Sequence, residues 1–191
     1  AWVELRHFRT LAGADPQATL FGHRYAMPVG VAPMGLAGLA WPGADEMLAR
    51  AAQAARIPYV SSTVANAPIE RLAALAPDSF WFQLYNLPAD DFAVARALVA
   101  RAEAAGARAL VVTLDVPARQ KRPRDVANGL SVPFRLGLRM ALHAALAPAW
   151  TLEVLRRGQP RFENFLPYLE EPPGTAALAA FAYHRMAGPL D

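Results

Sequence analysis

Short apolar runs alternate with stretches of helical spacing along the first 115 residues. The apolar runs predict four buried strands, at 27–32, 58–61, 80–83 and 109–113. Between them, apolar residues recur every three or four positions and predict helices at 45–55, 69–76 and 91–105. This alternation is typical of a parallel sheet built from βα units. The run at 109–113 is apolar throughout, so we expect both faces of that strand to be covered.

The spacing of the predicted strands limits which α/β folds the chain can adopt. Their starts are about 22 to 30 residues apart, which suits a (β/α) barrel or a doubly wound sheet. A complete eight-stranded barrel takes about 250 residues. Because only four clear units fit into 191 residues, we expect about the first four βα units of a (β/α)8 TIM barrel. Edge strands of such a partial barrel would be left unpaired, and we expect the isolated chain to self-associate.

The pattern changes after the fourth predicted strand. Residues 117–175 contain clustered prolines and arginines, with helical spacing at 134–146 and 151–157. A long excursion of this kind is more often a lid or a partner surface than a packing necessity. We therefore treat residues 1–191 as one partial barrel domain with an excursion at 117–175.

Composition excludes several classes of function. The chain has no cysteine, so disulfides, thiol chemistry and cysteine-based zinc sites are excluded, and we predict no metal site. Although the net charge is +3, the arginines are scattered and form no dense basic run, so we expect no nucleic-acid partner. No apolar run reaches the roughly 18 residues of a membrane span, and no signal peptide begins the chain. We expect a cytoplasmic protein.

Groups suited to ligand contact follow each predicted strand. They are Pro33-Met34-Gly35, then Ser61-Ser62-Thr63, then Gln83 with Tyr85, and then Thr113 with Asp115. Because ligands of parallel α/β folds bind at the carboxyl ends of the strands, these groups would face one mouth of the barrel. The alternative is that Ser61 and Thr113 merely cap turns and that residues 115–117 start a loop.

Several motifs resemble one known family. They are residues 30–39, 81–85, 113–117 and 121–129, together with 19–22. In order and spacing they are similar to the FMN-dependent α-hydroxy-acid oxidases and dehydrogenases, which include glycolate oxidase, L-lactate dehydrogenase and mandelate dehydrogenase. The resemblance covers nearly the whole chain. It implies a TIM barrel that binds FMN and oxidises an L-2-hydroxy acid, such as lactate, to the 2-oxo acid.

The resemblance also implies which residues meet the flavin. These are Pro33, Met34, Gly35, Ser61, Gln83 and Thr113. A side chain at Gly35 would crowd the ring, and Ser62 replaces Ser61 if the register slips by one residue. The amide of Gln83 is both a donor and an acceptor, which suits the mixed pattern of the flavin pyrimidine edge.

By the same resemblance, Tyr85 and Arg122 bind the substrate. The Tyr85 phenol would reach the substrate carboxylate or hydroxyl, and the Arg122 guanidinium would make a bidentate contact with the carboxylate. Glycolate, lactate and mandelate share that carboxylate, so the choice among them stays open. The electron acceptor, which is oxygen, a quinone or a cytochrome, stays open too.

The catalytic histidine of the family lies on a later barrel strand and has no counterpart here. His7, His23, His143 and His184 stand outside that context, and we interpret them as surface or loop residues. We therefore assign no catalytic residue. We expect the isolated chain to be inactive and, without the family's phosphate loops, to bind FMN weakly. The alternative is a non-catalytic truncated remnant that acts as a structural or interaction module.

The stretch 134–157 combines leucines with arginines at helical spacing. Such a basic amphipathic segment can lie on an anionic membrane surface, and membrane-associated members of the family use the corresponding loop in this way. The alternative is a helix that covers the active-site mouth. The resemblance also implies a homo-oligomer for the complete enzyme, either cytoplasmic or peripheral on the inner face of the cell membrane.

Overall fold

The computed structural model describes residues 13, 15–114, 142 and 144–169. Its centre is a parallel sheet of three strands in the order β3 (Tyr59–Ser62), β4 (Phe80–Tyr85) and β5 (Leu110–Thr113). The register places Ser62 opposite Gln83, and Tyr85 opposite Thr113. Three of the four predicted strands are thus confirmed, and the described residues form part of a barrel without closing it.

The first predicted strand, at 27–32, is wrong as a buried strand. It is reduced to a single parallel bridge between Val31 and Tyr59, and Met27 and Val29 are exposed. The backbone N–H of Val31 donates to the carbonyl of Pro58 over 2.8 Å. An apolar run indicates burial only if neighbouring layers cover it, and within the described residues this segment has one strand neighbour.

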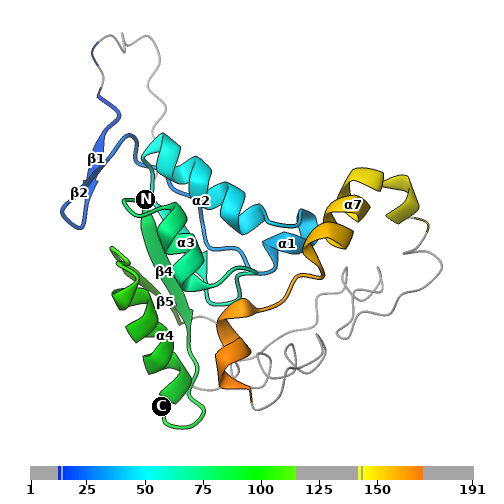
Figure 1. The fold of residues 1–191 in the computed structure, drawn as a ribbon. Coiled ribbons are helices and arrows are strands. Elements are labelled where there is room, and N and C mark those ends of the chain that lie inside the picture. Colours follow the sequence, from blue (N-terminus) through cyan, green and yellow to red (C-terminus); the bar gives the residue numbers. More distant parts are fainter. Residues whose placement is uncertain (1–12, 14, 115–141, 143, 170–191) are drawn as a thin grey trace.

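The three predicted helices are confirmed as α2 (Ala44–Ala55), α3 (Ile69–Leu75) and α4 (Ala93–Ala104). A short helix, α1 (Ala37–Ala40), interrupts the glycine-rich loop before α2. Helices α2, α3 and α4 pack against β3 and β4 (Figure 1). This places one helical layer on one face of the sheet.

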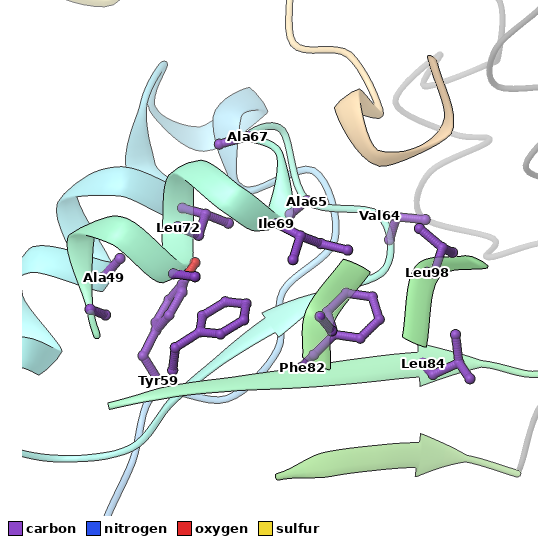
Figure 2. Packing of buried hydrophobic residues seen from close by; sticks show 14 of the residues in the cluster. Ala49, Tyr59, Val64, Ala65, Ala67, Ile69, Leu72, Phe82, Leu84 and Leu98 are labelled. Atoms are coloured by element: carbon purple, nitrogen blue, oxygen red, sulfur yellow. The ribbon is translucent and has the colours of Figure 1, made fainter. Parts of the chain in front are cut away.

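The core lies between that layer and β4. Side chains alternate along a strand, so Phe80, Phe82 and Leu84 share one side of β4 and belong to the buried core. Figure 2 shows Phe82 pointing toward the helices. Full burial of each such side chain contributes about 1.5–3 kcal/mol. The alternate residues of β4, which include Gln83 and Tyr85, face the other side of the sheet. The core therefore fixes which side chains β4 presents there.

Strand β5 is less covered than its sequence predicts. Leu110 and Val112 are 45% and 48% exposed, which contradicts the expectation of two covered faces. Both residues share the helix-facing side with their register partners Phe82 and Leu84. The helices that bury those partners pack mainly against β3 and β4, so within the described residues the apolar face of β5 is only partly covered.

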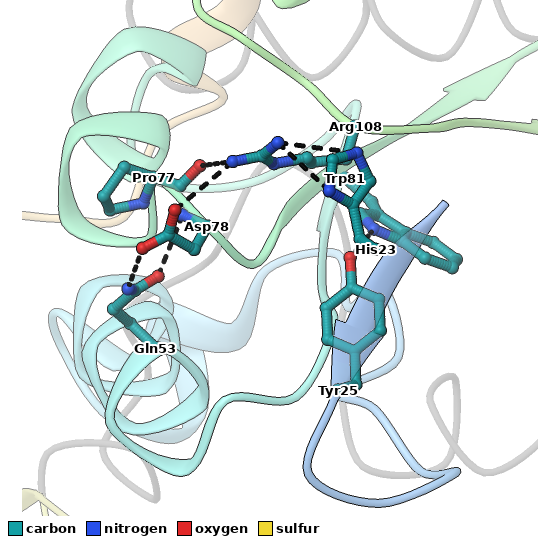
Figure 3. A network of polar contacts seen from close by, with 7 residues as sticks. All are labelled: His23, Tyr25, Gln53, Pro77, Asp78, Trp81 and Arg108. Carbon is teal, nitrogen blue, oxygen red and sulfur yellow. Dashed lines mark hydrogen bonds and ion pairs between the residues drawn. The ribbon is translucent and has the colours of Figure 1, made fainter. Parts of the chain in front are cut away.

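A hairpin that the strand pattern did not reveal lies ahead of the sheet. Strands β1 (Ala18–Leu20) and β2 (His23–Tyr25) pair antiparallel around Phe21-Gly22, where both residues have positive φ, as a two-residue hairpin turn requires. The indole N–H of Trp81 donates to the Tyr25 hydroxyl oxygen over 2.9 Å (Figure 3). These strands of three residues are too short to give a period of two.

The described part of the 117–175 excursion contains two elements, and the second of them packs against the core. Helix α7 (Pro148–Arg157) contains the predicted 151–157 stretch, whereas most of the predicted 134–146 stretch lies outside the described residues. A 3-10 turn, η1 (Glu163–Tyr168), follows, with Asn164 and Phe165 buried. None of the helices in the described ranges is long and apolar enough to cross a membrane.

Candidate functional site at the strand ends

Gln83 joins the carboxyl ends of all three strands. It is 2% exposed, and its Oε1 accepts hydrogen bonds from Ser62 Oγ (3.1 Å) and from the backbone N–H of Thr63 (3.4 Å). Its Nε2 donates to Thr113 Oγ1 over 2.7 Å. Because a backbone N–H can only donate, the amide oxygen faces β3 and the amide nitrogen faces β5. We call Ser62, Thr63, Gln83 and Thr113 the Gln83 set.

The two serines of β3 lie on opposite faces of the sheet. Ser61 shares the helix-facing side with Tyr59, and among the described residues its buried Oγ has no hydrogen-bond partner. Ser62 lies beside Gln83 in the register. The structure therefore brings Ser62, the alternative, into the Gln83 set and leaves Ser61 outside it.

Thr63 belongs to the predicted group Ser61-Ser62-Thr63, but no role for Thr63 itself follows from the sequence. It is completely buried; its Oγ1 donates to the backbone carbonyl of Gln83 over 2.6 Å and accepts from the backbone N–H of Tyr85 over 3.1 Å. These bonds extend the pairing of β3 and β4 one residue past the end of β3. The signal in the sequence is a hydroxyl residue directly after a strand, a position where it can replace a backbone partner.

The two predicted substrate residues differ in what the structure describes. Tyr85 ends β4 on the face of Gln83, opposite Thr113 in the register, and is half-buried. Arg122 and Asp115 lie outside the described residues. Tyr85 is thus placed beside the Gln83 set.

The predicted segment Pro33-Met34-Gly35 is exposed and lies against the loop that follows β3. The backbone N–H of Leu36 donates to the carbonyl of Val64 over 3.3 Å. A Cβ added at Gly35 would lie 2.6 Å from Val64 Cγ2, so this close approach already requires glycine. Since Val64 follows Ser62 and Thr63 directly, the exposed backbone of residues 33–35 lies near the Gln83 set.

His23, which the sequence predicts to be a surface or loop residue, lies on a strand and is only partly exposed. His23 is a half-buried residue of β2, and Arg108 Nη1 contacts its Nδ1 at 3.2 Å (Figure 3). Arg108 precedes β5, so this contact lies at the amino ends of the strands, opposite the Gln83 set. His7, His143 and His184 lie outside the described residues.

A pocket of about 300 Å³ lies away from the carboxyl ends of the strands, between the start of α2, Asn66 and residues 157–163. Burial raises the pKa of the Asp45 carboxyl there, and the backbone hydrogen bond from Asn66 opposes this rise. The Gln83 set does not line this pocket. Within the described ranges no group of histidine and acidic residues could hold a metal ion.

The hydrogen-bonding capacity of the Gln83 set fits a flavin edge. Gln83 Nε2 carries two protons, and its bond to Thr113 uses one. Thr113 Oγ1 accepts that bond and keeps its own proton for donation. The set therefore offers neutral donors and acceptors side by side, beside a backbone segment that no side chain at Gly35 obstructs.

Comparison with known proteins gives a consistent result. Residues 2–187 match the family model for the FMN-dependent dehydrogenases. The chain is 39% identical to (S)-mandelate dehydrogenase of Pseudomonas putida over 150 residues, which cover 78% of this chain and 37% of the relative. It is 42% identical to L-lactate dehydrogenase of Caulobacter vibrioides over 161 residues, 84% of this chain and 41% of the relative.

Solved structures agree with the family match. The crystal structure of the monotopic membrane protein (S)-mandelate dehydrogenase superposes with a TM-score of 0.85 at 33% identity, over 97% of this chain and 48% of that one. A mandelate oxidase variant with a C4a-OH-FMN adduct superposes with a TM-score of 0.59 at 37% identity, over 70% and 38% of the two chains. These relatives are TIM barrels, and the chain spans 37–46% of the length of the curated relatives compared with it. The chain belongs to the family of FMN-dependent dehydrogenases.

Proposed function

We propose that this chain supplies the wall that meets the flavin edge in an FMN-dependent 2-hydroxy-acid dehydrogenase or oxidase. The observation that carries the proposal is the Gln83 amide, which Ser62 and Thr113 hold in one orientation at the carboxyl ends of the strands. When bound, FMN accepts the two electrons and the hydrogen that leave the α-carbon of a 2-hydroxy acid, giving the 2-oxo acid.

Gln83, Thr113 and Ser62 would hold the pyrimidine edge of the flavin through neutral hydrogen bonds. Because Ser62 and Thr63 fix the amide oxygen, the second N–H of Gln83, which has no partner within the described residues, needs no reorientation when it meets a ligand acceptor. Pro33, Met34 and Gly35 would line the ring through their backbone. In this proposal Ser61 has a packing role, since it lies on the opposite face of β3.

Tyr85 and Arg122 would bind the substrate carboxylate, with Arg122 as the charged partner. No described histidine lies near the Gln83 set, because His23 lies at the other end of the sheet. We therefore propose that the residue that moves the substrate proton is none of the described residues, and that this chain alone does not turn over substrate.

A peripheral membrane contact is the second part of the proposal. Helix α7 presents Leu152 and Leu155 to solvent, with Leu155 77% exposed, and Leu142 and Leu146 are exposed just before it. Arg156 and Arg157 lie in its last turn. Exposed leucines beside arginines suit an anionic membrane surface. The similarity to a monotopic membrane protein supports this contact.

Flavin titration tests the first part of the proposal. We expect weak but saturable quenching of FMN fluorescence by the chain, and Gln83→Leu should weaken it at least about tenfold. Gln53→Leu is the matched control, because Gln53 on α2 is bonded to Asp78 in the loop before β4, away from the carboxyl ends of the strands. Equal FMN affinities of the two variants would contradict the proposed role of Gln83.

A further inference from the structure

A buried asparagine of η1 contacts the loop that carries two members of the Gln83 set. Asn164 is fully buried, although it is about 100 residues away from this loop in the sequence. Its Oδ1 accepts from the backbone N–H of Ile69 over 3.0 Å, at the start of α3. Its Nδ2 donates to the carbonyls of Thr63 (3.2 Å) and Ser62 (3.4 Å). One side chain thus satisfies three backbone groups of a single loop.

Asn164 does not contact Gln83 itself, but it contacts the two residues that bond to Gln83. The residues whose carbonyls accept from Asn164 are the ones whose hydroxyls act in the set: Ser62 Oγ donates to Gln83 Oε1, and Thr63 Oγ1 donates to the Gln83 carbonyl. A hydroxyl on a short side chain follows its own backbone closely. Displacement of the loop would therefore separate Ser62 and Thr63 from Gln83 Oε1 and leave Thr113 as the partner that still holds the amide within the described residues.

Asn164 is itself held firmly. Its backbone carbonyl accepts from Arg101 Nη1 over 3.1 Å, and Arg101 also pairs with Glu70. The next residue, Phe165, is fully buried in the core. The side chain of Asn164 therefore has a fixed base from which to hold the loop.

We propose that Asn164 is a positioning residue for the flavin-edge wall and acts through Ser62 and Thr63. This inference rests on the proposed function for its link to FMN. It assigns η1 a role in the site, although η1 contributes no group to the strand ends. Residues within the 117–175 excursion thereby set the orientation of the Gln83 amide.

The test is Asn164→Asp, with Asn66→Asp as the matched control. In Asn164→Asp the oxygen that accepts from Ile69 remains, whereas the second oxygen faces the carbonyls of Ser62 and Thr63 and repels them. Asn66 makes the same kind of bridge: its Oδ1 accepts from Gly38, and its Nδ2 donates to the carbonyl of Arg161. The control thus loses a side-chain amide donor at a half-buried position of the loop that Asn164 contacts, without touching the carbonyls of Ser62 and Thr63.

Two readouts decide the outcome. The first is hydrogen exchange of the backbone amides of Thr63, bonded to Gln83 Oε1, and of Tyr85, bonded to Thr63 Oγ1, resolved by peptide mass spectrometry. The second is FMN affinity by fluorescence titration. We expect Asn164→Asp to speed exchange at both amides and to weaken FMN binding at least about tenfold each, while Asn66→Asp stays within about twofold.

Equal effects of the two variants on these amides, or unchanged exchange in Asn164→Asp, would overturn the proposal. If the unmodified chain shows no saturable FMN binding, the proposed function fails, and the exchange data alone still decide the positioning role. If Asn164→Asp does not fold, Asn164→Ser replaces it. Serine is too short to bridge all three groups, so retained protection of Thr63 and Tyr85 in that variant would also overturn the proposal.

Discussion

The side-chain amide of Gln83 donates to the hydroxyl of Thr113 over 2.7 Å and so joins the carboxyl ends of β4 and β5. In the register Thr113 lies opposite Tyr85, so the bond runs diagonally across the sheet face. It fixes the amide nitrogen of Gln83 on the β5 side, away from β3. The geometry of this bond makes the flavin-edge proposal testable by small substitutions.

Thr113→Val removes the acceptor for Gln83 Nε2 and keeps the shape of the side chain. We expect a loss of about 1 kcal/mol in the free energy of unfolding, measured with urea, and weaker FMN binding. Thr151→Val is the control, because the Thr151 hydroxyl donates to the Ala144 carbonyl over 2.7 Å in the α7 region. A loss of FMN affinity in the control as large as in Thr113→Val would contradict the assignment.

Gly35→Ala should destabilise the chain, because its Cβ would lie 2.6 Å from Val64 Cγ2. We expect a cost of about 1–3 kcal/mol from overpacking, and Val64→Ala in the same chain should recover most of it. Gly30→Ala offers a contrast, since its Cβ would meet the backbone carbonyl of Pro58 at 2.9 Å, and no side-chain truncation removes that oxygen. A double-mutant cycle by urea unfolding measures the coupling, and zero coupling between positions 35 and 64 would show that the contact is not the cause.

The buried carboxyl of Asp45 should make the free energy of unfolding depend on pH in a predictable direction. Burial raises the pKa of its carboxyl in the folded chain, so the folded state holds a proton there more tightly than the unfolded state. Stability from this group is therefore present below the unfolded pKa and is lost as the pH rises through the folded value. Asp45→Asn keeps an oxygen for the Asn66 N–H, and we expect it to remove this loss and to stabilise the chain at pH 7 relative to the unmodified one. Urea unfolding from pH 4 to pH 7 checks this, and lower stability of Asp45→Asn at pH 7 would refute it.

Leu155→Glu tests the membrane contact. Leu155 is 77% exposed on α7, beside Arg156, so we expect the substitution to abolish co-sedimentation with phosphatidylglycerol vesicles. Leu110→Glu is the matched control, because Leu110 is an exposed leucine on the edge strand β5. Vesicle binding that Leu110→Glu reduces as much as Leu155→Glu would indicate general hydrophobic adsorption instead.

The sequence predicted the helices and three strands well because their apolar residues repeat with a period that one covered face produces. It failed where burial depends on neighbours distant in the chain. Val29 lies in an apolar run but is exposed, and Val112 continues a run that the helices do not cover. Local pattern is the same in both settings, so the difference arises only from tertiary packing.

Prediction of the candidate site from the sequence was limited in the same way. Gln83, Thr113 and Tyr85 were predictable because each follows or ends a strand and matches a family motif. The choice between Ser61 and Ser62 depends on the parallel register with β4, which a single sequence does not define. Thr63 and Asn164 act through backbone carbonyls and amides, and such contacts leave no periodic pattern in the sequence.

A chimera tests the central claim most directly. The matched segment of Pseudomonas putida (S)-mandelate dehydrogenase, 37% of its length, would be replaced by the corresponding residues of this chain. The measurement is FMN content per purified protein, with Gln83→Leu compared against Gln53→Leu in the same chimera. We predict stoichiometric FMN in the chimera and in Gln53→Leu, and a marked loss in Gln83→Leu. A folded chimera without FMN, or one whose FMN content is unchanged by Gln83→Leu, would contradict the claim that this chain forms the flavin-edge wall.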